Sequence, residues 1–143
     1  MKWFILLVFL SSCTTLHNTT SNQVRKSSTH QVSIHDIYVL VEVAGESIKG
    51  KLKKQSTLEI NLTDMRMMGN DGCNDFGGKI TKHNADKMLL SFSDINATEM
   101  YCDELSNKVG NSFYAVKKYR REGMLLTLLS NNEEVLLTYK KVD

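Results

Sequence analysis

The sequence predicts an α+β domain in which a curled antiparallel sheet of about eight strands, an open or cracked barrel, packs on a single helix. Three observations lead to this prediction. Segments with apolar residues at every second position recur along the chain, one segment has apolar residues three and four positions apart, and the connections are too short for parallel crossovers. The 143 residues, 41% of them hydrophobic, suffice for one compact domain.

The first half of this domain is predicted to consist of strands joined by tight turns. A strand with one buried face has apolar side chains at alternate positions. Five segments fit this pattern or flank a turn within it, and they cover residues 37–43, 58–62, 65–68, 78–83 and 87–92. A loop over 45–55 separates the first two strands, and a glycine-rich turn over 69–77 separates the two hairpins.

A helix is predicted between Asp103 and Lys118. Its apolar residues recur three and four positions apart, and they are Leu105, Val109, Phe113 and Val116. Asp103 is the expected N-cap, and Lys117 and Lys118 are expected at the end, where positive charge complements the helix dipole.

Three further strands are predicted after the helix, over residues 117–121, 124–129 and 134–140. Residues 124–129 are apolar on both faces except for Thr127. This pattern is typical of a central strand that is covered on two sides.

The N-terminus resembles a bacterial lipoprotein signal. Lys2 precedes an apolar run of eight residues, which is too short to cross a bilayer, and small residues follow. The segment Leu10-Ser11-Ser12-Cys13 resembles a lipobox, in which Cys13 would receive lipid before cleavage. An ordinary signal peptide with an incidental Cys13 is the alternative.

These features divide the chain into three parts. We expect a signal peptide over 1–12, the lipidated Cys13 with a flexible Ser-, Thr- and Asn-rich spacer over 13–34, and the folded domain over 35–143. Acyl chains such as palmitate would hold the domain on a membrane. Thr14 follows Cys13 instead of the Asp that favours the inner membrane, so we expect the outer membrane, with the domain facing the periplasm.

Composition argues against several classes of function. A net charge of +2 provides no long-range field for nucleic acid. The four histidines are scattered without metal-ligand spacing, and no catalytic arrangement or cofactor motif is recognisable, so we expect no metal, no cofactor and no enzyme. Six methionines could suit Cu(I), but we expect most of them in the core, and they are Met65, Met67, Met68, Met88, Met100 and Met124.

Cys73 and Cys102 remain once Cys13 is assigned to lipid. In an oxidising compartment, an even pair of cysteines most simply forms a disulfide. Two buried reduced thiols are an alternative. A redox couple is another, although the chain lacks a CxxC pair and any neighbouring cation that would lower a thiol pKa. We predict the disulfide.

Two segments around these cysteines resemble the META domain family. The first contains Gly72, Cys73, Asn74, Phe76 and Gly78, and the second contains Thr98, Met100 and Cys102. The resemblance extends over roughly residues 37–139, and the heat-inducible HslJ-type lipoproteins belong to the same family.

The resemblance implies a function without catalysis. It suggests an envelope lipoprotein that supports tolerance of stress such as heat shock by binding a protein or ligand. A structural likeness of the family to secretion pilotins suggests an alternative, a carrier or chaperone that holds an acyl chain or the hydrophobic segment of an exported partner. We expect a monomer whose partners are the membrane, through its anchor, and an envelope protein or lipid.

Overall fold

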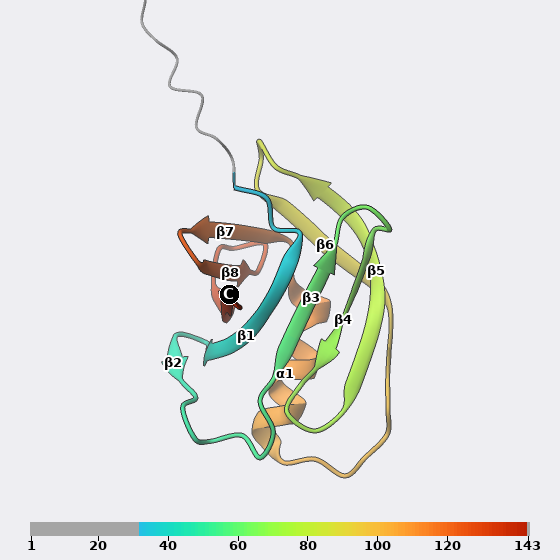
Figure 1. The fold of residues 1–143 in the computed structure, drawn as a ribbon, viewed down its shortest axis with the longest axis vertical. Coiled ribbons are helices and arrows are strands. Elements are labelled where there is room, and N and C mark those ends of the chain that lie inside the picture. The colour runs from blue at the N-terminus through green and yellow to red at the C-terminus, as the bar shows by residue number, and fades with distance from the viewer. Residues whose placement is uncertain (1–31, 143) are drawn as a thin grey trace, which may run out of the picture.

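The computed structural model describes residues 32–142, which form one sheet and one helix (Figure 1). The predicted signal peptide, Cys13 and most of the spacer lie outside the described residues. The strands are β1 (Asp36–Val43), β2 (Glu46–Ser47), β3 (Thr57–Asn61), β4 (Arg66–Asn70), β5 (Asp75–Asn84), β6 (Leu89–Ala97), β7 (Lys118–Glu122), β8 (Leu125–Leu129) and β9 (Val135–Lys141), and the helix is α1 (Glu104–Ala115).

Eight of the strands form a closed antiparallel barrel. Each of them pairs with its neighbour in chain order, β2 being an addition at the edge of β1, and β9 returns to pair with β1. The closing pair is reinforced by a salt bridge of 2.8 Å between Lys141 Nζ and Asp36 Oδ2, and this contact lowers the pKa of Asp36. The predicted curled antiparallel sheet with one helix is confirmed.

The seam between β6 and β7 has the shortest strand pairing in the barrel. Only Leu89 and Lys118 are in register across it, flanked by backbone hydrogen bonds from Leu90 N to Lys117 O (3.1 Å) and from Tyr119 N to Met88 O (2.9 Å). The helix α1 belongs to the connection between these two strands. The two strands therefore diverge where the helix is inserted into the chain.

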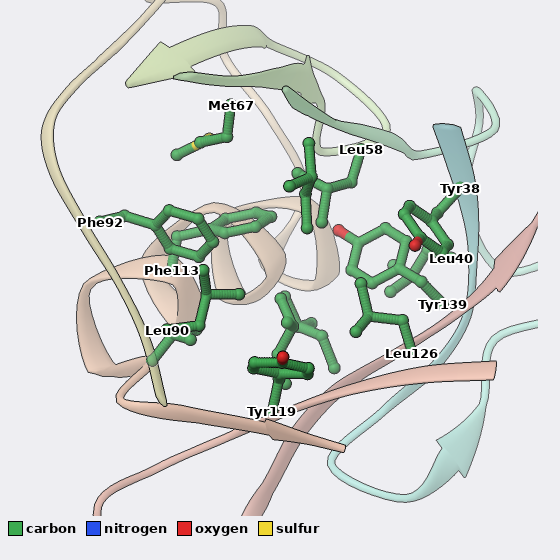
Figure 2. Packing of buried hydrophobic residues seen from close by; sticks show 14 of the residues in the cluster. Tyr38, Leu40, Leu58, Met67, Leu90, Phe92, Phe113, Tyr119, Leu126 and Tyr139 are labelled. Atoms are coloured by element: carbon green, nitrogen blue, oxygen red, sulfur yellow. The ribbon is translucent and has the colours of Figure 1, made fainter. Parts of the chain in front are cut away.

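The core fills the inside of the barrel. In Figure 2, Phe113 of α1 lies near Phe92 and Leu90 of β6, while Tyr38, Leu126 and Tyr139 occupy another part of the interior. The Phe113 ring centroid is 4.6 Å from that of Phe76 and 5.9 Å from that of Phe92. Aromatic contacts of this kind attach the helix to β5 and β6.

The predicted start of the helix is confirmed, and its predicted end is wrong. Asp103 is the N-cap, and its Oδ1 accepts a hydrogen bond of 2.9 Å from Ser106 N. The helix ends at Ala115, because Val116 is extended and buried and Lys117 N donates to Leu129 O. The predicted basic end of the helix is therefore wrong, since Lys117 lies beyond it and Lys118 begins β7.

The strand predictions are confirmed with shifted ends. The β4 and β5 strands extend into the predicted glycine-rich turn and leave only residues 71–74 outside the sheet, and β2 occurs inside the predicted loop 45–55. β8 is central, between β7 and β9, with four buried residues. Ile34 is also buried and accepts a hydrogen bond from Tyr38 Oη, so packing begins one residue before the predicted domain start.

The expectation that most methionines lie in the core is wrong. Met67 is buried, whereas four others are exposed: Met65, Met68, Met88 and Met100. Met65 and Met88 occupy turns with positive φ, and Met68 is on the outer face of the two-residue alternation in β4. Among residues 32–142, none of the helical structure is long and apolar enough to cross a membrane.

Gly69 gives a test of the packing between β3 and β4. An added Cβ would overlap the carbonyl oxygen of Thr57 and lie 3.1 Å from Leu58 Cα, both in the β3 backbone. We therefore expect Gly69→Ala to lower the free energy of unfolding by about 1–3 kcal/mol, measured by urea denaturation. Gly77→Ala is the control, because its Cβ would meet the β4 backbone only at 3.7 Å. Equal stability of the two variants would contradict this account.

Candidate functional site

The turn over residues 71–74 joins β4 to β5 and contains the start of the predicted motif. Asp71 Oδ1 accepts hydrogen bonds from Cys73 N (2.8 Å) and Asn74 N (2.6 Å), and Asp71 N donates to Asn74 O. Gly72 has a φ of +96°, a conformation that glycine adopts without strain. The aspartate side chain thus organises the turn from within.

Asn74 attaches a second segment of the chain to this turn. Its Oδ1 accepts hydrogen bonds from Thr98 Oγ1 (3.0 Å) and Met100 N (2.8 Å), and its Nδ2 donates to Cys102 Sγ at 2.9 Å. One buried side chain therefore holds three points of the segment 98–102, which leads from β6 into α1.

The disulfide links the same two segments covalently. Cys73 and Cys102 are bonded across a sequence separation of 29, which confirms the predicted pairing. Both cysteines are bonded to each other, so the alternative of two buried reduced thiols does not describe the oxidised protein. Closing a loop of this length stabilises a fold by about 3–4 kcal/mol through the entropy of the unfolded chain.

The motif residues divide into two groups. Cys73, Asn74, Thr98 and Cys102 come together at the turn, where Met100 contributes its backbone N–H while its side chain is exposed. Phe76 and Gly78 lie in β5 and serve packing. Phe76 contacts Phe113, and a Cβ on Gly78 would lie 3.0 Å from Met67 Cε and from Ser93 O.

The titratable groups of the described residues were compared with the arrangement that a metal ion needs and with the shifts that burial causes. Within 32–142, no three His, Cys, Asp or Glu side chains are placed to hold a metal ion together. His83 Nε2 lies 3.4 Å from Tyr119 Oη, and burial lowers the pKa of this histidine and raises that of the tyrosine. Such shifts follow from desolvation in a part of the barrel wall where the two rings stack.

A cavity of about 450 Å³ lies beside β1, β2 and the loop that follows. It is lined by Leu40, Val41, Ser47, Ile48, Lys49, Gly50, Leu52, Lys54, Gln55 and Ser56. Leu40 and Ile48 are buried and form an apolar floor, whereas Lys49 and Lys54 are exposed. The lysines of this loop are visible in the sequence. The cavity is not, because it depends on how β2 and the loop lie against β1.

A second cavity of about 160 Å³ lies on the helix side of the motif turn. It is lined by Asp71, Asn74, Phe76, Ile95, Ala97, Asn107, Gly110, Asn111 and Tyr114. Asn74 and Phe76 of this lining were identified as motif residues in the sequence analysis. The spacing along the chain carries no sign that α1 places two asparagines opposite this turn.

Asn74 provides a test of how the segment 98–102 is held. Asn74→Ala removes both hydrogen bonds that its Oδ1 accepts, so we expect faster hydrogen exchange at the Met100 amide and a loss of about 1–3 kcal/mol in the free energy of unfolding. Asn96→Ala is the control, because the Asn96 amide is exposed and bonds only to Asp94 O nearby. Unchanged protection of Met100 in Asn74→Ala would rule out the anchoring role.

Two solved structures are similar in fold to this chain. A protein solved by NMR is similar over 75% of this chain and 89% of its own, with 23% identity and a TM-score of 0.59. The crystal structure of a duf4847 family protein from Bacteroides vulgatus ATCC 8482 is similar over 76% of this chain and 95% of its own, with 11% identity and a TM-score of 0.55. At these identities the likeness shows the fold alone.

The sequence itself identifies the family. Comparison with the curated proteins gives no match. The family model of the META domain matches residues 31–143, which contain the whole barrel, the helix and both motif segments. This chain therefore belongs to the META domain family.

Proposed function

We propose that this protein is a lipoprotein of the bacterial cell envelope that supports tolerance of envelope stress by binding a protein or a lipid, without catalysis. The observation that carries this proposal is the set of bonds that the motif residues form. Cys73, Asn74 and Cys102 are bonded to one another or to the adjoining backbone, so the motif braces a domain. A braced domain with surface cavities is suited to binding.

The disulfide and the N-terminal sequence support the envelope as the location. Disulfides persist in oxidising compartments such as the bacterial periplasm. The segment 1–12 has the charge, apolar run and small residues of a secretory signal, and Cys13 follows it directly. In this proposal acyl chains on Cys13 hold a monomer on the outer membrane, facing the periplasm.

Metabolic labelling tests the anchor. In bacterial cells given a palmitate analogue, we expect the wild-type chain to take up label and to fractionate with the outer membrane. Cys13→Ser should lose both properties, because the thiol is the site of attachment. A matched Ser12→Ala variant keeps a small residue before the cysteine and should stay labelled. Unlabelled, freely soluble wild-type protein would refute the anchor.

A second function, that of a carrier for an acyl chain or a hydrophobic segment, is favoured by the larger cavity. Its volume of about 450 Å³ is in the range of about 300–1,000 Å³ that is typical of ligand sites. The floor is apolar, and the lysines around it could contact an anionic head group. The barrel interior is occupied by side chains (Figure 2), so the carrier function is assigned to this outer cavity.

Mass spectrometry of the purified protein tests the carrier function. We expect an acyl-chain ligand to copurify with wild type and to be absent from Ser47→Trp, whose indole would fill the cavity. Glu46→Trp is the matched control, because Glu46 is the neighbouring exposed residue of β2 and does not line the cavity. Wild-type protein free of lipid would argue against a carrier and leave the anchored binding protein unaffected.

A further inference from the structure

Asp71 is a buried carboxylate without a cationic partner. The residue is 5% exposed, and within residues 32–142 it has no salt bridge to Lys, Arg or His. Buried charges in proteins are normally paired, because removing an ion from water is costly. The burial of the Asp71 carboxylate without a cation therefore calls for a reason beyond its role in organising the turn.

The two oxygens of Asp71 have different surroundings. Oδ1 accepts the hydrogen bonds from Cys73 N and Asn74 N and is thereby committed to the turn. Oδ2 accepts no hydrogen bond from the described part of the chain and lies 3.1 Å from the place that a Cβ on Gly110 would take. Because residue 110 is a glycine, the backbone of α1 lies close to this oxygen with no side chain between them, and both residues line the 160 Å³ cavity.

The other groups around this cavity are suited to a cation. Asn107 and Asn111 are one helical turn apart on α1 and therefore share a face. Asn107 donates its amide N–H to Cys102 O at 3.4 Å, which leaves its Oδ1 as an acceptor. Phe76 and Tyr114 add apolar ring surface to the lining. The lining contains no Lys or Arg, so an anion would find no positive side chain here.

We propose that this cavity binds a primary alkylammonium group. The three N–H donors of such a group match three acceptors, namely Asp71 Oδ2 and the side-chain oxygens of Asn107 and Asn111. The alkyl stem would lie against the apolar part of the lining, which includes Ile95 and Ala97. The volume is sufficient for the end of an amine chain, so the ligand is either a free amine or the lysine side chain of a partner protein. This site does not depend on the proposed function.

NMR titration of the full, disulfide-bonded chain tests the site. With n-butylammonium chloride, we expect saturable shifts of the backbone amides of residues 71–74 and of the side-chain amides of Asn107 and Asn111. Tetramethylammonium chloride at the same ionic strength lacks N–H donors and should not produce them. Nα-acetyl-lysine amide distinguishes the two sources: binding of both amines supports a partner's lysine, whereas binding of butylammonium alone supports a free amine.

Substitutions provide the matched variants. Asp71→Asn keeps an Oδ1 acceptor for the turn and removes the charge, so the affinity for butylammonium should fall by about tenfold or more. Asp75→Asn makes the same change at an exposed carboxylate outside the cavity and should bind as wild type does. Should Asp71→Asn fail to fold, the exposed Asn111→Ala variant serves instead, with an expected loss of several-fold.

Three results would overturn the proposal. Equal shifts with tetramethylammonium would show a general salt effect. Equal affinity in Asp71→Asn or, if that variant does not fold, in Asn111→Ala would show that the cavity groups make no contact with the amine. The absence of saturable shifts in the wild type would show that the cavity does not bind an alkylammonium group.

Discussion

The attachment of the segment 98–102 to the turn 71–74 is the constraint on which the domain depends. After the backbone bond from Thr98 N to Asp75 O, the chain passes to the start of α1 without regular backbone pairing, and Asn74 Oδ1 accepts hydrogen bonds from Thr98 Oγ1 and Met100 N. The Cys73–Cys102 bond makes the same attachment covalent, directly before the N-cap residue Asp103. The position of the helix relative to the barrel is thus set at its first turn, and the packing of Phe113 on Phe76 and Phe92 completes the docking.

Most of the fold could be predicted from the sequence because its elements are encoded locally. Alternation of buried and exposed residues, as in β3 and β5, is visible in the sequence as a two-residue period, and the N-cap at Asp103 depends on a contact with Ser106 only three residues away. The errors concern features that depend on distant parts of the chain. The end of α1 is set by the pairing of Lys117 with Leu129, and the exposure of Met68 depends on which face of β4 is turned outward.

The candidate sites were less predictable for the same reason. The cysteine pair could be proposed from parity and compartment, but nothing in the local sequence shows that the Asn74 amide contacts three separate points of the later segment. Asp71 is separated from Gly110 by 39 positions, and their proximity arises only when the helix packs across the turn. Cavities form between elements, so periodicity within one element carries no information about them.

The short pairing at the seam between β6 and β7 determines where the barrel opens locally. A barrel whose neighbouring strands all pair over many residues has no preferred place to open. Here β6 and β7 are joined by one register pair and two flanking hydrogen bonds. Local opening will begin at this seam, since the fewest bonds must break there. The seam residue Leu89 pairs with Asn84 at the end of β5, whereas the disulfide holds the beginning of α1 beside the start of β5, so a local opening at the seam leaves the first turn of the helix attached to the barrel.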